Sequence, residues 1–223
     1  MDIASILPPS LLSERLESLG YLYRRADAAV SNFVEASGVS CPFGCGSCCE
    51  AFVPDILPLE AAYLAAFLVA ADRPRAYSMA AAGLEARRRD DGRVGCPLYA
   101  DGTPYHCTVY EARPLICRMF AFSATRDKLG VPAFSVCRSG SSAKGPRSAS
   151  GPGLAAAYGA EPPVMADMGS ELAAIDPESA GSRGPLPEAL LEALGRVLFL
   201  VGMKEDDPLD SGPDIRPPLP RAG

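Results

Sequence analysis

Eight cysteines are the residues of this sequence best suited to do chemistry, and half of them are crowded into one short stretch. The segment "CPFGCGSCCE", residues 41–50, contains four of them, and the other four stand singly further along the chain. The full set is Cys41, Cys45, Cys48, Cys49, Cys96, Cys107, Cys117 and Cys137. Thiolates are soft ligands that select zinc or iron–sulfur clusters over magnesium or calcium. The sequence therefore predicts a metal centre held by sulfur.

The chain has one histidine, His106, which stands beside Cys107. No alternation of cysteine and histidine accompanies it, so a loop residue is a more natural interpretation of His106 than a metal ligand. Three kinds of metal site remain as interpretations of the cysteines. The spacing Cys41-x3-Cys45-x2-Cys48 also occurs in radical SAM enzymes, but these need alternating strands and helices downstream, where this sequence predicts helices.

The second interpretation is structural zinc, which usually pairs two C-x2-C knuckles. Here only the first half resembles a knuckle, because the last four cysteines are separated by longer intervals. The third is an iron–sulfur cluster, which thiolates normally ligate. The adjacent thiols of Cys48 and Cys49 point in different directions and are expected to sit on different metal atoms. We favour an iron–sulfur cluster as the cofactor, with zinc as the alternative.

Charge and hydropathy limit the other partners. The formal net charge is −6 and the sequence pI is about 4.9, whereas phosphate binding needs a basic stripe, so we expect no nucleic acid partner. The first residues lack the charged start and apolar core of a secretory signal. The most apolar stretches, 61–71 and 189–203, are shorter than the roughly 18 residues of a membrane span. We expect a soluble, cytoplasmic protein with no membrane partner, and its protein partner is unknown.

A cytoplasmic location bears on the cysteines, because a reducing compartment keeps thiols free unless a metal holds them. A disulfide framework remains the competing interpretation of an even number of cysteines. Two arginines, Arg113 and Arg118, bracket Cys117. Their guanidinium groups could bind the cofactor by offsetting its negative charge and donating to sulfur, and surface salt bridges are the alternative.

The elements that position these residues are predicted to be mostly helices. Apolar residues recur every three or four positions over 8–37, where Ser10 can cap a helix and Gly38 can end it. Further helices are predicted at 58–71, 75–89 and 187–203, and a short one near Pro114. The segment 96–110 reads as two extended pieces around a turn. The fold class is therefore mainly α, with irregular cysteine-rich loops and one short β-hairpin in a small metal-centred domain.

The expected division of the chain follows from composition. Residues 1–145 form a cysteine-cluster metal-binding domain with an N-terminal helix. Residues 146–223 form a loosely ordered extension with one helix at about 187–203 and an acidic, proline-rich, disordered tail. No nucleophile–base pair, phosphate loop or pair of carboxylates stands out, so no reaction is assigned and the domain by itself is not predicted to be an enzyme.

The ordered pieces "CPFGCGSCC", "CPLY", "CTVYEARPLICR" and a later single Cys137 resemble the YkgJ family of cysteine-cluster proteins, a zinc- or iron-chelating CxxCxxCC domain. The resemblance covers about residues 41–140. It includes all eight cysteines together with Pro97, Leu98, Tyr110, Arg113 and Pro114. It implies that the eight cysteines are the metal ligands. A similar domain in flagellin lysine N-methylases implies that such a module can serve protein modification or redox chemistry.

Overall fold

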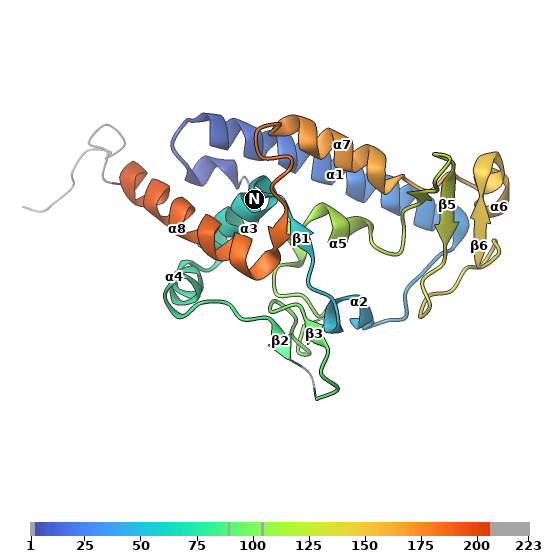
Figure 1. The fold of residues 1–223 in the computed structure, drawn as a ribbon, viewed down its shortest axis with the longest axis horizontal. Coiled ribbons are helices and arrows are strands. Elements are labelled where there is room, and N and C mark those ends of the chain that lie inside the picture. The colour runs from blue at the N-terminus through green and yellow to red at the C-terminus, as the bar shows by residue number, and fades with distance from the viewer. Residues whose placement is uncertain (1–2, 89, 104, 206–223) are drawn as a thin grey trace, which may run out of the picture.

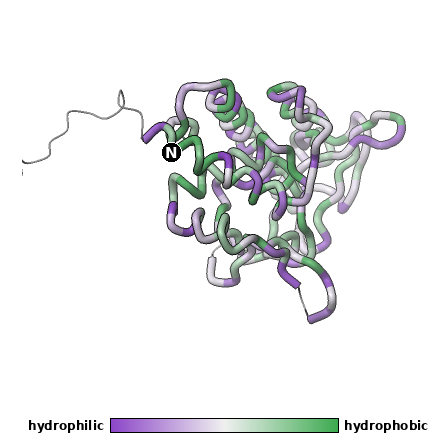
Figure 2. Tube along the Cα trace, turned by 60° about the vertical axis from the view of Figure 1, so that its left-hand side comes forward, coloured by the Kyte–Doolittle hydropathy of each residue, from purple (hydrophilic) through white to green (hydrophobic). Residues whose placement is uncertain are grey.

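The computed structural model describes residues 3–88, 90–103 and 105–205, and helices supply most of its regular structure. Eight α-helices and a few very short strands make up these residues, which confirms the predicted mainly α fold (Figure 1). Figure 2 shows the more hydrophobic segments among the packed helices and the more hydrophilic ones at several loop tips.

Helix α1, Leu11–Ser37, is the longest helix and follows its sequence signals closely. The Ser10 hydroxyl accepts a hydrogen bond from the backbone N–H of Ser13, and Gly38 ends the helix with a φ of 66°. One face of the helix is buried, including Leu16, Leu19, Tyr23, Ala26 and Phe33. The helix therefore runs along the core, as its apolar stripe predicted.

Helix α3, Pro58–Ala71, forms the centre of the main core and packs against helix α8, Leu186–Glu205. Almost every side of α3 is buried, which explains its uniformly apolar sequence. Helix α4, Arg73–Ala82, packs on both. It ends before the predicted residue 89, because the chain turns at Gly83, where φ is 84°. Among the described residues, no helix has the length and apolar character needed to cross a membrane.

The strands form three small antiparallel sheets. Strand β1, Asp55–Ile56, pairs with β7, Gly184–Pro185; β2, Arg87–Arg88, pairs with β3, Val94–Gly95; and β4, Thr125–Arg126, β5, Pro132–Ser135, and β6, Ser148–Ser150, follow one another in the third sheet. The hairpin predicted within 96–110 is reduced to one isolated antiparallel bridge between Tyr99 and Cys107.

The other four α-helices are α2, Ser47–Glu50; α5, Leu115–Met119; α6, Leu154–Tyr158; and α7, Met165–Ile175. Buried residues fall into two clusters. The main cluster lies among α1, α3 and α8, and the second joins the last turns of α1 to β5 and α6 through the rings of Phe33, Phe134 and Tyr158.

The segment after residue 145 contains β6, α6, α7, β7 and α8. Helix α8 corresponds to the helix predicted at 187–203 and contributes Leu190, Leu194 and Val197 to the main core. The division of the chain at residue 145 stays a prediction. The tail predicted to be disordered is 205–223; Glu205 is the last residue of α8, and 206–223 lie outside the described residues.

Candidate metal centre

Five cysteines come from four segments, and Figure 1 shows α2 beside β3, with α5 above them. Helix α2 carries Cys48 and Cys49, Cys96 directly follows β3, Cys107 lies in the next loop, and Cys117 lies in α5. The backbone N–H of Cys96 donates to the carbonyl oxygen of Cys49 at 2.9 Å, which fixes β3 against α2. We call these five cysteines the inner group.

Two glycines allow the backbone to close around this group. A Cβ atom at Gly95 would lie 2.3 Å from the carbonyl oxygen of Glu50, and one at Gly46 would lie 2.7 Å from the ring of Tyr99. A larger residue at Gly95 would require the backbone to move, and one at Gly46 would displace the side chains of Tyr99 and His106. The small residues between the cysteines are therefore needed for α2 to lie against β3 and the loop after it.

His106 braces the cysteine loop from the side. Its Nε2 lies 2.6 Å from the carbonyl oxygen of Gly44, and its ring stacks on that of Tyr99 at a centroid distance of 5.3 Å. The residue adopts a φ of 51°, and its buried Nδ1 has no hydrogen-bond partner among the described residues. The predicted loop histidine thus contacts the loop backbone that carries the first cysteines.

The thiols of Cys48 and Cys49 interact directly, with 3.9 Å between their sulfur atoms. This contact is the largest of the effects that lower the pKa of Cys48 to about 6, and the positive charge of Arg113 is another of them. The same contact, together with desolvation, raises the pKa of Cys49. One of the two sulfurs therefore carries the negative charge that the pair shares.

The other inner thiols are harder to ionise because they are desolvated. Burial raises the pKa of Cys96 to about 11 and also raises the pKa of Cys107. For Cys117, burial raises the pKa well above its usual value, and the charges of Cys96 and Cys107 add to this effect. A bound soft cation would replace these protons, since metal binding to thiols releases protons.

The remaining cysteines form an outer group of Cys41, Cys45 and Cys137. Ser40 and Ser141 exchange two backbone hydrogen bonds of 3.0 Å, which draws the chain before Cys41 toward the chain after Cys137. Partial desolvation, and then the charges of Cys137, Cys45 and Cys48, raise the pKa of the Cys41 thiol, although the residue as a whole is exposed. Cys48 thus acts on thiols of both groups.

The two arginines have different roles. Arg118 is 5% exposed and donates to Asp27 Oδ2 at 2.5 Å, to the carbonyl oxygen of Arg113 at 2.8 Å and to that of Glu111. Its guanidinium carbon lies 4.2 Å from the centre of the Tyr23 ring. These contacts tie α5 to α1, whereas the sequence had suggested that Arg118 binds the cofactor.

Arg113 fits that cofactor-binding interpretation better. Its guanidinium lies over the ring of Tyr110 at 3.7 Å and 3.6 Å from Asp27 Oδ1. Its Nε is buried with no hydrogen-bond partner among the described residues. Its charge lowers the pKa of both Cys48 and Cys107. An unpartnered buried donor and this electrostatic effect fit a site that holds negatively charged sulfur.

Within the described residues, no three or more His, Cys, Asp or Glu side chains are already arranged as a metal-ion site. What the structure brings together is a soft donor set, the inner group, beside one arginine whose Nε has no partner. The fit to a metal therefore rests on the chemistry of the thiols and on Arg113. Eight cysteines were predicted as ligands; of the outer three, Cys41 is affected by the charge of Cys48 from the inner group.

Two acidic residues near the site have no counterpart in the sequence analysis. Asp27 contacts both arginines, and Glu60 is buried at the start of α3. Glu60 has a sequence signal, since an acidic residue in the first turn of a predicted helix can cap it. Asp27 gives no comparable signal, because its partners are about 90 residues away in the sequence.

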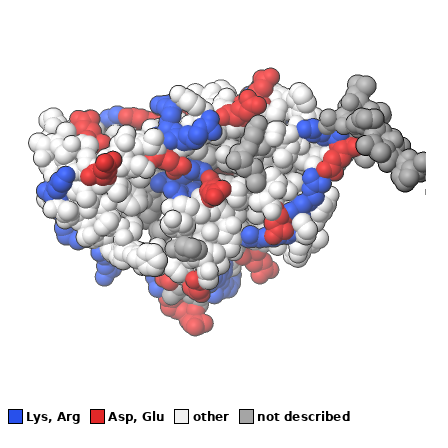
Figure 3. Space-filling view, turned by 180° about the vertical axis from the view of Figure 1, so that it is seen from behind, with Lys and Arg blue, Asp and Glu red and all other residues white. Residues whose placement is uncertain are grey.

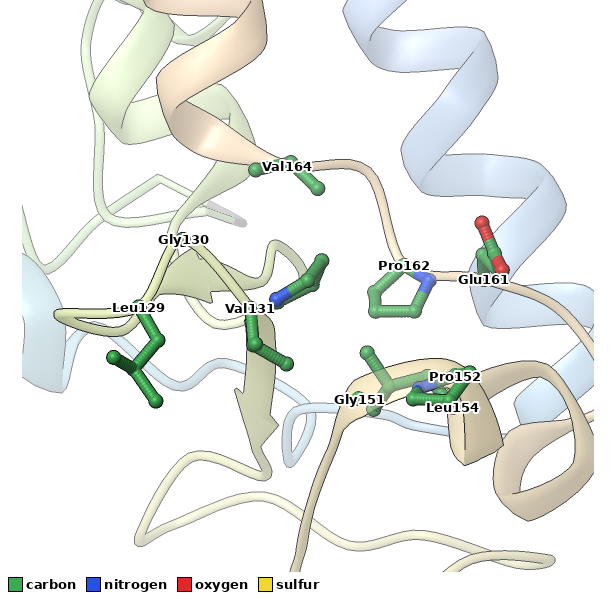
Figure 4. Close-up of a pocket in the computed structure, with 10 residues that line it drawn as sticks. Leu129, Gly130, Val131, Gly151, Pro152, Leu154, Glu161, Pro162 and Val164 are labelled. Atoms are coloured by element: carbon green, nitrogen blue, oxygen red, sulfur yellow. The ribbon is translucent and has the colours of Figure 1, made fainter.

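A separate hollow of about 380 Å³ lies near the third sheet (Figure 4). It is lined mostly by apolar residues and glycines, and Glu161 is the one charged residue among those that line it. Figure 4 shows Pro152 and Pro162 facing one another across it from different segments. No cysteine contributes to its lining, so it is distinct from the metal centre.

Comparison with known families agrees with this site. Residues 40–138 match the family model CxxCxxCC, described as "Putative zinc- or iron-chelating domain". The matched range contains all eight cysteines and both arginines. The resemblance noted from the sequence is confirmed. No curated protein and no solved structure matches the chain.

Proposed function

We propose that the inner group holds an iron–sulfur cluster that serves redox or protein-modification chemistry. The observation that carries this proposal is the number of inner thiols that act on one another. The charges of Cys96, Cys107 and Cys48 all raise the pKa of Cys117, and Cys49 is in contact with Cys48. Four of the five thiols would suffice for a cluster, and because a cluster distributes its thiolates over several metal atoms, they need not surround a single ion.

The chain's own residues have distinct tasks in this proposal. Cys48, already the most acidic thiol of its pair, would bind first as a thiolate. Cys96, Cys107 and Cys117 would lose their protons as they bind. Arg113 would donate to sulfur and offset the negative charge of the thiolates. An iron–sulfur cluster, when bound, takes up and releases electrons at a potential set by such contacts.

A zinc-stabilised interaction module without catalytic activity is the second candidate. Cys41, Cys45, Cys48 and Cys137 equal in number the ligands of a closed zinc site. A different zinc site, with Cys48 and Cys49 on one ion, also fits the structure: the 3.9 Å between their sulfurs matches the edge of a zinc–sulfur tetrahedron, which is about 3.8 Å for zinc–sulfur bonds of about 2.3 Å. Adjacency therefore does not by itself place these two sulfurs on different metal atoms.

The remaining parts of the proposal concern location and partners. We take the protein to be cytoplasmic, with a metal ion or cluster as its partner and neither nucleic acid nor membrane. The net charge of −6 supports the exclusion of nucleic acid. Basic and acidic side chains are also interspersed on the face that Figure 3 shows.

Purification without oxygen, followed by metal analysis and an absorption spectrum, tests the proposal. Bound iron with inorganic sulfide and charge-transfer absorption in the visible range is the expected result. A colourless protein with stoichiometric zinc that accepts no cluster on reconstitution would establish the zinc candidate instead. Protein with neither metal, and with no titratable thiols after denaturation without reductant, would replace chelation with disulfides.

A further inference from the structure

Glu60 is a buried carboxylate at a position where the core gives no obvious reason for one. It lies in the first turn of α3, it is 1% exposed, and the residues on either side of it in the helix belong to the main core. A buried charge is costly unless it is paired or hydrogen-bonded. The contacts of Glu60 should therefore reveal what it does.

Its two oxygens connect three helices. Oε2 accepts a hydrogen bond from the backbone N–H of Leu57 at 3.0 Å, which caps α3. Oε1 accepts from the backbone N–H of Leu115 at 2.8 Å and from the hydroxyl of Tyr23 at 3.2 Å. The guanidinium of Arg183 lies 3.9 Å from Oε2. Glu60 thus joins α1, the start of α3 and the start of α5.

The contact with Leu115 matters because α5, with five residues, is too short to be stable without tertiary contacts. Glu60 holds the helix at Leu115, two residues before Cys117. Asp27 holds it at Arg118, the residue after Cys117. The backbone that carries the Cys117 thiol is therefore fixed by two polar contacts to the rest of the molecule.

We propose that Glu60 is a positioning residue for the metal centre: by holding the backbone N–H of Leu115, it directs the Cys117 thiol toward Cys96 and Cys107. Glu60 does not itself contact the metal. The inference rests on the proposed metal-binding function and names a residue on which the inner group depends.

The first test uses metal-free protein and the alkylation of each cysteine by iodoacetamide, resolved by mass spectrometry. Glu60→Gln offers one acceptor oxygen to three donors, and Glu60→Leu offers none. The rate at Cys117 relative to Cys137, in the same molecule, should rise several-fold in Glu60→Gln and further in Glu60→Leu. If Glu60→Leu does not fold, the relative alkylation rate at Cys117 in Glu60→Gln tests the positioning role by itself.

Tyr23→Phe is the matched control, because it removes the third donor and leaves both backbone contacts of Glu60 in place. Its relative rate at Cys117 should equal that of the wild type. An unchanged ratio in Glu60→Gln, or an equal rise in Tyr23→Phe, would overturn the positioning role. A general loosening of the fold would raise the rates at Cys117 and Cys137 together and leave the ratio unchanged, which also overturns it.

The second test is a double-mutant cycle on zinc affinity, measured by competition with a chelator. Glu60→Gln should weaken zinc binding by about 10- to 100-fold, the usual effect of losing a residue that orients a ligand. In a Cys117→Ser background, the same change should have little further effect, because its ligand is gone. Full additivity would overturn the inference. A wild type that binds neither zinc nor iron would instead contradict the proposed function, and the alkylation ratio would then decide the positioning role.

Discussion

The contact between the thiols of Cys48 and Cys49 shifts their pKa values in opposite directions, down for Cys48 and up for Cys49. Their sulfurs lie 3.9 Å apart, and the contact is the largest of the effects that lower the pKa of Cys48 to about 6. At neutral pH the metal-free pair therefore carries one negative charge on Cys48. Cys48 is therefore already a thiolate at neutral pH and can bind a cation without losing a proton.

This difference predicts how each thiol reacts as the pH changes. Because only the thiolate is nucleophilic, alkylation of Cys48 should approach its maximum above a pH of about 6. Alkylation of Cys96, whose pKa is about 11, should still be rising at pH 9. Site-resolved alkylation of metal-free protein between pH 5 and 9 measures both. A half-maximal rate at Cys48 near pH 9 would refute the assignment.

Arg113 carries a positive charge that lowers the pKa of two inner thiols, Cys48 and Cys107. Arg113→Gln should raise the pKa of Cys48 and Cys107, since the present charge lowers both. Metal affinity should fall by about tenfold or more, and Arg113→Lys should recover part of the loss. Chelator competition gives the affinities. Arg126→Gln, which disrupts the exposed ion pair with Asp167, is the control and should leave them unchanged.

At the scale of elements, α5 depends on partners that lie far away in the sequence. Asp27 on α1 accepts a hydrogen bond of 2.5 Å from Arg118, whose side chain is 5% exposed. Asp27→Ala would leave that guanidinium without its carboxylate. We expect the free energy of unfolding to fall by about 1–3 kcal/mol, the cost of leaving a buried polar group unsatisfied.

Urea unfolding measures this loss, and an exposed ion pair supplies the comparison. Glu171→Ala removes the partner of Arg25, and both side chains of that pair are more than 40% exposed. Such a pair contributes about 0–1 kcal/mol. Equal losses in the two variants would show that the Asp27 contact has no special role in holding α5.

The elements that the sequence predicted well are those with local signals. Helix α1 has a capping serine, an apolar stripe and a terminating glycine, and all three act as expected. The short strands were missed for two reasons. Strands β2 and β3, and likewise β4 and β5, pair locally, but β2, β3 and β4 have two residues each, too few to show an alternating pattern. Strands β1 and β7 are far apart in the sequence, although Asp55 lies opposite Pro185. Packing of α8 on α3 brings such segments together.

The candidate site was predictable in composition and not in arrangement. The cysteine types and spacing indicated a sulfur site, and the matched domain supports metal binding. The separation into inner and outer groups depends on how α2, β3 and α5 meet, which no local signal specifies. For the same reason the sequence assigned Arg118 to the cofactor, although its donors face Asp27 and backbone carbonyls.

At the scale of the whole molecule, each group of cysteines lies beside its own apolar cluster. Cys96 and Cys107 pack against the main core. Val39 and Val136 belong to the second cluster, and they stand two residues before Cys41 and one before Cys137. The metal centre therefore lies where segments attached to two separate cores converge. Helices supply most of the buried residues of the main core, whereas 96–117 contributes Leu98, Val109, Ala112 and Leu115.

Metal removal should consequently loosen the protein unevenly. Hydrogen exchange in residues 96–117 should become faster after treatment with a chelator, because metal affinity is also folding free energy for the segments that supply the ligands. Helices α1, α3 and α8 should keep their protection, because their buried faces form the main core and α3 packs chiefly on α8. Exchange measured by mass spectrometry on loaded and stripped protein compares them. Equal exchange in 96–117 in the two forms, with metal confirmed in one, would show that this segment is folded by its own contacts and that the inner group is formed before the metal binds.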